Sequence, residues 1–383
     1  MRRFLLFLSL LVVILSACGY YIGHRLLSGS QTLAQHPTEV WFSVVSFLVF
    51  VLVGPLLSRI LPERWAGRFY ALRWALNMTM AIFFALLFYT SAIDLIIFGL
   101  SFVVSTETAL NLSSASLSLI AALVLVTLVI GSVQALKPKV YRVDVPLKGL
   151  PSNFSGYTIA QISDLHIGEM IGRRYVQTVV EITNALKPNL IAMTGDILDG
   201  AANLIAPVAA ELGRLKATDG ALYITGNHEY YWGVENALAA MKNAGAKVLL
   251  NENVRIQRGS QEIVVAGVTD ISAGRGFPGH KSDPEKSIAG VSTDKIKILL
   301  AHQPASYRDA VKAGFSLQLS GHTHGGQFFP WSLVVRLFQH YNKGLMKHEN
   351  LWIYVNRGTA TWGPRLRFGI PPEISLITLR SGD

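Results

Sequence analysis

Five short apolar stretches in the second half of the chain end in polar side chains of the same few types, and this pattern constrains the fold most. The stretches read YTIAQISD, NLIAMTGD, ALYITGN, IKILLAH and LQLSGH, with helical stretches between them at about 174–186, 204–216, 234–244 and 305–313. Apolar strands that alternate with helices indicate a sheet buried on both faces. The further apolar stretches KVLLNENVRI, EIVVAGVTD, LWIYVNR and EISLITL are enough for a second sheet. We therefore expect an α/β domain over residues 157–383.

The polar residues at the strand ends are carboxylates, amides and imidazoles. They are Asp164 and His166, Asp196 and Asp199, Asn227 and His228, His302, and His322 with His324. Side chains at strand carboxyl ends converge on one crevice in α/β folds. A single histidine is more often structural than functional, but five of the ten histidines in the chain occupy such positions. Burying so many charged groups together requires a compensating cation.

The types of side chain indicate which cations fit. Oxygen and imidazole ligands without thiolate suit manganese, iron or zinc, and magnesium is also compatible. The single cysteine, Cys18, excludes an internal disulfide and a cysteine-based zinc site. Seven candidate ligands are too many for one tetrahedral ion and suit two ions that share a carboxylate. Two ions about 3.5–4 Å apart can clamp a phosphoryl group, so we expect two divalent metal ions.

These motifs resemble those of the calcineurin-like metallophosphoesterases. DLH at 164–166, GDILD at 195–199, GNHE at 226–229, His302 and GHTH at 321–324 match every element of the family pattern in order. The tail YVNRGTATWGPRLRFGIPPEISL at 354–376 is similar to the bacterial membrane-associated subgroup, which commonly carries transmembrane segments before the catalytic domain. The resemblance covers about residues 150–383 and implies a four-layer α-β-β-α sandwich.

The resemblance also implies a role for each matched residue. One metal ion would be held by Asp164, His166, Asp196 and His324. Asp196 would bridge to a second ion, completed by Asn227, His302 and His322. His228 would contact the phosphoryl oxygen or protonate the leaving group, with Asp199 as its orienting partner. Glu229 is as consistent with a structural role as with a catalytic one.

Two further sets of residues leave alternatives open. Arg173 and Arg174, and in the tail Arg357, Arg365 and Arg367, can contact a phosphate or simply be solvated. An apolar patch after the GHTH loop comprises Trp331, Leu333, Val334, Leu337 and Phe338. A core helix is the simpler interpretation of this patch. The alternative is a flap that meets lipid or covers an acyl chain.

The first 136 residues hold most of the hydrophobic excess of a chain that is 51% hydrophobic. Apolar runs predict membrane helices at 4–22, 41–58, 74–94 and 115–136, with a linker over 137–156 that contains a strand at 139–145. The segment ending at Cys18 resembles a bacterial lipobox, but a plain first helix is the simpler interpretation because lipoproteins seldom have several spans. An acid such as Asp94, late in a span, more often lies at an interface than on an ion pathway. The segment 95–104 stays undecided.

The distribution of positive charge predicts the topology. Residues before the first span, between the second and third, and after the fourth hold ten basic residues: Arg2, Arg3, Arg59, Arg64, Arg68, Arg73, Lys137, Lys139, Arg142 and Lys148. The two other loops hold Arg25 alone. The positive-inside rule therefore predicts cytoplasmic termini and a cytoplasmic catalytic domain on a bacterial plasma membrane.

We therefore expect a membrane-anchored dinuclear phosphohydrolase that cleaves a phosphodiester or pyrophosphate, lipid-linked substrates included. One alternative substrate is UDP-2,3-diacylglucosamine, as in lipid A metabolism. A regulatory or binding module with an inactive site is the non-enzymatic alternative, and the intact motif set disfavours it. A transporter with an accessory domain has only Asp94 in its support. No basic stripe with interleaved aromatics occurs, so nucleic acid is not expected as a partner; protein partners stay undetermined.

Overall fold

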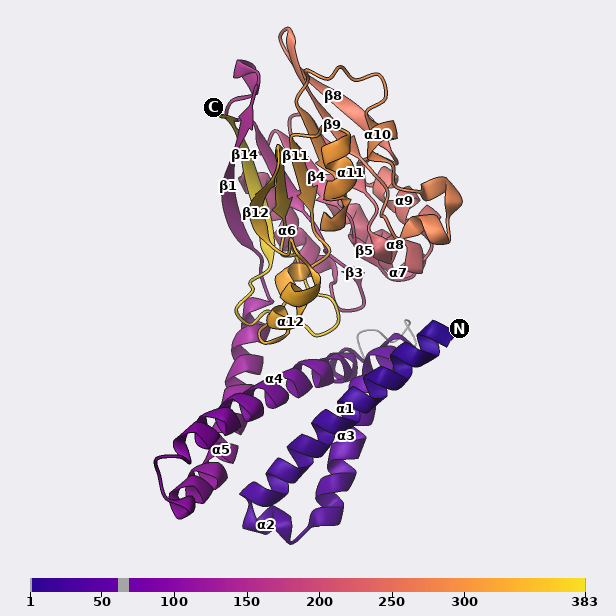
Figure 1. The fold of residues 1–383 in the computed structure, drawn as a ribbon. Coiled ribbons are helices and arrows are strands. Elements are labelled where there is room, and N and C mark those ends of the chain that lie inside the picture. The colour runs from indigo at the N-terminus through magenta and orange to yellow at the C-terminus, as the bar shows by residue number, and fades with distance from the viewer. Residues whose placement is uncertain (1, 61–68, 383) are drawn as a thin grey trace. The chain divides into compact units, whose positions relative to one another are not determined.

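The computed structural model of the chain describes residues 2–60 and 69–382 and divides into two compact units (Figure 1). The helical unit comprises the chain up to Val133 together with Gly363–Leu366. The sandwich unit comprises Gln134–Trp362 and the chain from Arg367 onward. The predicted order, membrane helices followed by an α/β domain, is confirmed.

The described residues of the helical unit before the sandwich form four long helices and one short one. They are α1 (Arg2–Gly29), α2 (Gln31–Ala34), α3 (Pro37–Ile60), α4 (Tyr70–Leu100) and α5 (Thr106–Gln134). Each long helix contains an apolar segment of at least 21 residues, enough to cross a bilayer. The helices extend beyond the apolar runs because hydropathy marks only the part suited to hydrocarbon. Most of the undecided segment 95–104 therefore belongs to α4, while Arg64 and Arg68 of the charge count lie outside the described residues.

Apolar side chains join α1, α3 and α4. Leu15, Val51 and Phe83 form a buried cluster, and Cys18 packs against it while remaining half-buried. Cys18 thus lies within a continuous helix, as a plain first span would have it.

A polar cluster lies inside the helical unit and includes Asp94. Its Oδ1 lies 2.7 Å from Nε of Arg25, and its Oδ2 accepts a 2.6 Å hydrogen bond from the Tyr21 hydroxyl. Arg25 is only 7% exposed and also donates to Oγ of Ser116 on α5 at 2.6 Å. An apolar surrounding solvates charges poorly, so the pair offsets the two charges within the bundle. The sequence did not indicate this partner for Asp94.

The sandwich unit contains two six-stranded sheets. The first has the order β1 (Lys139–Lys148), β14 (Glu373–Gly382), β2 (Thr158–Ile162), β4 (Leu190–Thr194), β6 (Ala221–Ile224) and β7 (Lys247–Val248). The second has the order β12 (Gly344–His348), β13 (Leu351–Val355), β11 (Leu317–Ser320), β10 (Lys297–Leu300), β9 (Gln261–Gly267) and β8 (Glu252–Arg258). Within the first sheet β2, β4 and β6 run parallel, and within the second β9, β10, β11 and β13 do. A short pair, β3 (Ile167–Gly168) and β5 (Leu198–Asp199), lies beyond the ends of β2 and β4.

Three hydrophobic cores separate four layers, as the α-β-β-α prediction requires. The helices α6 (Arg173–Ala185), α7 (Ala202–Ala209) and α9 (Val234–Asn243) cover the first sheet through a core that includes Val176, Ile191 and Met241. A second core lies between the sheets, where Ile159 and Ile298 are fully buried. The third lies between the second sheet and α11 (Tyr307–Lys312); the short helix α10 (Pro284–Ser287) lies beside β8 and β9.

The strand expected at 139–145 within the linker is present and runs three residues further, as β1 (Lys139–Lys148). β1 pairs in parallel with β14 over ten consecutive residues, from Lys139 opposite Glu373 to Lys148 opposite Gly382. Its sequence alternates apolar and polar residues, which suits an edge strand with one buried face. Only four residues, 135–138, connect α5 to this sheet.

The helix α12 (Trp331–Phe338) is not the core helix that we considered the simpler interpretation. Ser332 is its only buried residue, whereas Leu337 and Phe338 are 81% and 79% exposed. An apolar sequence pattern indicates a helix with an apolar face but not what covers that face.

Candidate metal centre

The predicted site residues come together where strands of both sheets end. In the first sheet β2 leads to the DLH motif, β4 to GDILD and β6 to GNHE, which opens α8 (Asn227–Tyr231). In the second sheet β10 leads to His302 and β11 to GHTH. The buried Gln161 of β2 links the sheets, because its Nε2 donates to Oγ1 of Thr194 and to the Ser320 carbonyl, both at 2.9 Å. The site thus spans the seam between the sheets.

Several of these residues adopt backbone conformations that side chains disfavour. A positive φ occurs at five candidate ligands: Asp164 (53°), His166 (48°), Asp196 (50°), His322 (70°) and His324 (51°). Non-glycine residues seldom adopt this region, and such strain concentrates at functional sites. The tight turns aim the side chains back over the strand ends.

Two motif glycines allow these turns to approach each other. A Cβ on Gly226 would lie 2.2 Å from Oδ1 of Asp196, and one on Gly321 would lie 2.2 Å from Oδ2 of Asp164. Any side chain there would therefore displace a carboxylate of the site. This close approach is the physical reason why a glycine opens both the GNHE and the GHTH motif.

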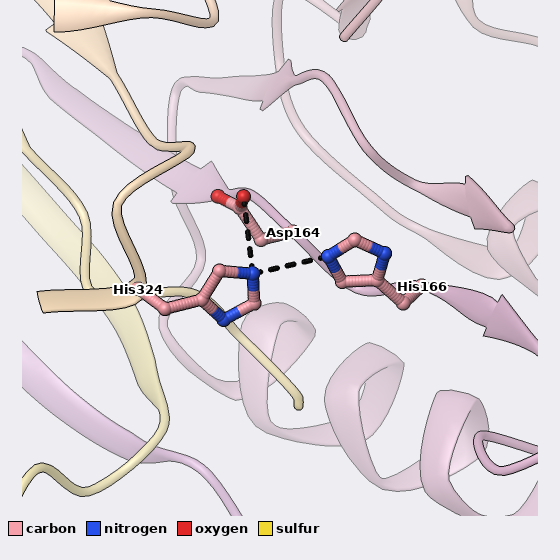
Figure 2. Close-up of side chains that lie close together, drawn as sticks. All are labelled: Asp164, His166 and His324. Atoms are coloured by element: carbon pink, nitrogen blue, oxygen red, sulfur yellow. Dashed lines mark hydrogen bonds and ion pairs between the residues drawn. The ribbon is translucent and has the colours of Figure 1, made fainter. Parts of the chain in front are cut away.

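The first cluster comprises Asp164, His166 and His324 (Figure 2). Nε2 of His324 lies 3.0 Å from Nε2 of His166 and 3.4 Å from Oδ1 of Asp164. Asp164 is completely buried, and its carboxylate also accepts the backbone N–H of His322 at 2.9 Å. Two imidazole nitrogens and a carboxylate oxygen therefore point at one small volume.

The second cluster surrounds Nε2 of His302. Oδ2 of Asp196 lies 3.1 Å from this nitrogen, Oδ1 of Asn227 lies 3.2 Å from it and Nδ1 of His322 lies 3.3 Å from it. On the other side of the ring, Nδ1 of His302 is 2.9 Å from the Thr194 carbonyl. A proton on Nδ1 leaves the Nε2 lone pair free for a ligand.

Asp196 belongs to both parts of the site. Its carboxylate can share an ion with His302 and His322, and it also groups with His166 and His228. Burial alone would raise the pKa of Asp196, but the neighbouring imidazoles, His302 foremost, lower it well below its usual range. Burial acts to lower the pKa of His302, and the charge of Asp196 raises it well above the usual value. The buried carboxylate thus requires positive charge beside it.

This set of donors fits divalent metal ions. Carboxylate, amide and imidazole donors converge, the sole cysteine lies in the helical unit, and the carboxylates are buried without lysine or arginine as ion-pair partners among the described residues. Mn²⁺, Fe²⁺ and Zn²⁺ all accept such ligands. The seven predicted ligands all lie in or beside these clusters, and His228 also groups with His166 and Asp196.

His228 and Asp199 lie together beside the clusters. Nδ1 of His228 is 2.9 Å from Oδ1 of Asp199, and Nε2 of His228 is 3.9 Å from Oδ2 of Asp196. Burial acts to lower the pKa of His228, but Asp199, followed by the charge of Asp196, raises it above its usual value. Asp199 also lies 3.2 Å from Nδ1 of His166, so one carboxylate orients both a candidate ligand and His228.

Comparison with known proteins identifies the family. The sequence profile described as calcineurin-like phosphoesterase matches residues 157–326. An uncharacterized metallophosphoesterase of Campylobacter jejuni is 30% identical over 383 residues, which cover 98% of this chain and 99% of that protein. The chain belongs to the calcineurin-like metallophosphoesterase family.

Other metallophosphoesterases match the chain over shorter segments. The transmembrane protein with metallophosphoesterase domain of Bos taurus is 37% identical over 265 residues, covering 66% of this chain and 60% of that protein. A metallophosphoesterase of Caenorhabditis elegans is 37% identical over 251 residues, 63% of this chain and 52% of that protein. The chain thus spans between half and three fifths of the length of these two relatives. The solved NAD nucleotidase of Haemophilus influenzae aligns with a TM-score of 0.39 at 15% identity, over 53% of this chain and 45% of that one, which is too low to carry an argument.

Glu229 of this metallophosphoesterase joins two motif loops. Its carboxylate accepts the backbone N–H groups of Asp196 (3.1 Å), Ile197 (2.8 Å), Leu198 (3.1 Å) and Gly226 (2.7 Å). A buried carboxylate that accepts four amides holds loops together and has no lone pair directed at a substrate. The structure therefore favours the structural interpretation of Glu229.

The sequence did not indicate the aromatic residues around His228. Nε1 of Trp232 donates to Oδ1 of Asp199 at 2.7 Å, and the rings of Tyr231 and Trp362 lie 5.1 and 5.7 Å from the His228 ring. For Tyr231 and Trp232 the sequence did contain a signal, because the run YYW follows the GNHE motif directly. Trp362 had no local signal.

The arginines left open by the sequence take different positions. Arg367 is completely buried and donates to the carbonyls of Arg357 (2.6 Å) and His324 (3.1 Å), so it supports the His324 loop. Arg357 lies 4.2 Å from the Tyr141 ring centroid, with Nε 3.3 Å from Oε2 of Glu373. Arg173 pairs with Glu211 and Arg174 is exposed, while Arg365 falls in the segment grouped with the helical unit.

Proposed function

We propose that this chain is a membrane-anchored, dinuclear metal-dependent phosphohydrolase that cleaves a phosphodiester or pyrophosphate, lipid-linked substrates included. The observation that carries the proposal is a chain of linked ligand groups: His166 groups with Asp164 and His324, Asp196 groups with His302 and His322, and His166 and Asp196 group with each other and with His228. Membership of the metallophosphoesterase family and four helices long enough to cross a membrane support it.

In this proposal each cluster holds one divalent ion. Asp164, His166, Asp196 and His324 hold the first, and Asp196, Asn227, His302 and His322 hold the second. Manganese, iron and zinc suit these donors best, and magnesium is compatible. When bound, such ions supply Lewis acidity towards phosphoryl oxygens and lower the pKa of water.

The chain's own residues then handle the proton. Hydrolysis exchanges the bond between phosphorus and the leaving oxygen for a bond between phosphorus and a water oxygen, and the leaving oxygen takes up a proton. We assign this proton to Nε2 of His228, because Asp199 holds Nδ1 and raises the pKa of the ring. General acid catalysis of this kind contributes about 10²–10⁴-fold. His228 also groups with His166 and Asp196, so its position alone would allow it to bind a metal ion. Metal analysis of a His228 variant shows whether His228 is a general acid or a metal ligand.

Metal removal tests the proposal on the full-length protein. After treatment with a chelator, hydrolysis of bis(p-nitrophenyl) phosphate should disappear, and it should return when Mn²⁺, Fe²⁺ or Zn²⁺ is restored with about two ions bound per chain. A p-nitrophenyl monoester and UDP-2,3-diacylglucosamine assayed in parallel report the bond preferred. Undiminished activity of the stripped protein would show that the chemistry does not need these clusters.

We also propose that the sandwich unit faces the cytoplasm of a bacterial cell. The ten-to-one distribution of basic residues around the four spans supports this orientation. A topology reporter fused after Asp383 should behave as cytoplasmic, and one inserted beside Glu107 as external. An external C-terminal reporter would contradict the proposed orientation; if the reporter beside Glu107 is external as well, α5 does not cross the membrane.

A further inference from the structure

The exposed face of α12 is unusual for the sandwich unit. Leu337 and Phe338 are 81% and 79% exposed, the highest values for large hydrophobic side chains among the described residues of this unit. Comparable values occur in the helical unit at Leu95 (71%) and Phe102 (75%). Leu333 lies one turn before Leu337 on the same face and is 45% exposed.

Positive charge borders this face. No aspartate or glutamate occurs between Gln327 and His348, whereas Arg336, Lys343 and Lys347 fall in this segment. Burial, followed by the charges of Arg336 and Arg357, lowers the pKa of Lys343. An apolar helix face bordered by basic residues suits the surface of an anionic bilayer.

α12 lies at the end of the sandwich unit where the chain arrives from α5. The backbone N–H of Phe329, two residues before α12, donates to the Phe368 carbonyl at 2.9 Å. The next residue, Gly369, donates its N–H to Oε1 of Gln134, the last residue of α5, at 3.2 Å. Two hydrogen bonds therefore connect the root of α12 to the end of a membrane-capable helix.

The connection to α5 keeps this end of the sandwich unit close to a membrane. From Gln134 to Lys139 the chain can extend by only about 18 Å, at ~3.6 Å per residue. A lipid surface is thus held at high local concentration next to α12, whereas a soluble partner is not.

α12 is also directly joined to the metal centre. A Cβ on Gly326 would lie 2.3 Å from the Cα of Ser332, so the buried side of α12 packs on the loop that carries His324. The exposed face of α12 is therefore separated from the loop that carries His324 by one helix diameter, roughly 10–12 Å.

We propose that α12 is an interfacial helix that inserts Leu337 and Phe338 into the bilayer surface and holds the metal centre at headgroup depth. Arg336 and Lys343 then meet anionic headgroups. The substrate class that follows, a phosphoester in a lipid headgroup, rests on the proposed function, whereas the insertion itself does not.

Lipid-borne quenching tests the insertion. In full-length protein in nanodiscs, Cys18→Ser removes the only cysteine, and Phe338→Cys or Lys286→Cys on the exposed side of α10 then carries an NBD label. NBD at 338 should be at least threefold more strongly quenched by doxyl-labelled phospholipid than NBD at 286. Equal quenching overturns the proposal. So does a blue-shifted label at 338 that doxyl lipid does not quench, because protein rather than lipid then covers α12.

A pair of substrates separates insertion from chemistry. The double substitution Leu337→Glu/Phe338→Glu should leave kcat on bis(p-nitrophenyl) phosphate unchanged, which also shows that the variant is folded. It should lower hydrolysis of a nanodisc lipid carrying a p-nitrophenyl phosphodiester headgroup about tenfold, while Lys286→Glu should not. Unchanged hydrolysis of the lipid probe overturns the role in substrate access. Absence of activity on both probes in the wild type counts against the proposed function, and quenching then still decides the insertion.

Discussion

Asp196 and His228 are neighbours in the site, and substitutions should separate their roles. The backbone N–H of His228 donates to Oδ1 of Asp196 at 2.8 Å, and Oδ2 of the same carboxylate faces His302. Asp196→Asn should lose activity and metal together, because an amide cannot supply the shared negative charge. His228→Ala should keep about two bound ions and lose about 10²–10⁴-fold in kcat.

Metal analysis alongside kinetics decides this prediction. His340→Ala is the matched control, because His340 is exposed and lies outside both ligand clusters. If His228→Ala empties the site, then His228 is a ligand. The group of His166, Asp196 and His228 then describes the centre better than our assignment.

A second prediction at this scale concerns Glu229, whose carboxylate accepts four backbone N–H groups. Glu229→Gln removes the charge and places an amide N–H₂ against donors, and hydrogen bonds to charged groups contribute about 1.5–3 kcal/mol each. We expect a loss of about 3 kcal/mol in the stability of the sandwich unit, together with weaker metal binding. Thermal unfolding at saturating metal measures it, with exposed Glu235→Gln as control. An unchanged Tm would show that the hydrogen bonds of the four backbone N–H groups do not need the negative charge of Glu229.

At the scale of elements, the pair between α1 and α4 should stabilise the helical unit. Asp94→Asn leaves Arg25, which is 7% exposed, without its carboxylate. Removing one member of a fully buried pair costs about 3–5 kcal/mol, and the cost here should be smaller because the Asp94 side chain is 27% exposed. We expect a clear drop in Tm of the protein in detergent. The double variant Arg25→Met/Asp94→Leu should recover most of it, since apolar replacements need no compensation. A double variant as unstable as the single one would mean that the pair itself, rather than its charge balance, is required.

Elements also show where local patterns stop being informative. The strand–helix alternation predicted the buried strands that carry the motifs, because fully apolar runs with turn residues on both sides have few other solutions. The strand predicted inside the linker stopped at residue 145, because Pro146 and Gly149 interrupt the pattern there and the partner strand β14 lies at the other end of the chain. α12 was assigned to the core for a similar reason, since periodicity does not reveal whether a face is covered.

At the scale of the whole molecule, the pairing of the first and last strands predicts where a soluble fragment must begin. β14 is paired by β1 on one side and β2 on the other, so a fragment starting at residue 150 exposes its long edge. An open strand edge pairs readily with other chains. A fragment of residues 137–383 should be monomeric and active on bis(p-nitrophenyl) phosphate, whereas one of residues 150–383 should aggregate. Size-exclusion chromatography of both measures this, and a monodisperse shorter fragment would show that β1 is dispensable.

The sequence by itself determined the family, the layered fold, the membrane-capable helices and the set of residues that meet at the site. These features are local: each motif sits on a turn directly after its own strand, and parallel strands bring their carboxyl ends to one edge. Only the tertiary structure decided which side chains support the motifs. Arg25 and Asp94 are 69 residues apart, Trp232 and Asp199 are 33 apart, and Arg367 reaches His324 across 43. Such contacts depend on how elements pack, as does the exposure of α12. They leave no pattern in the segment that contains either partner.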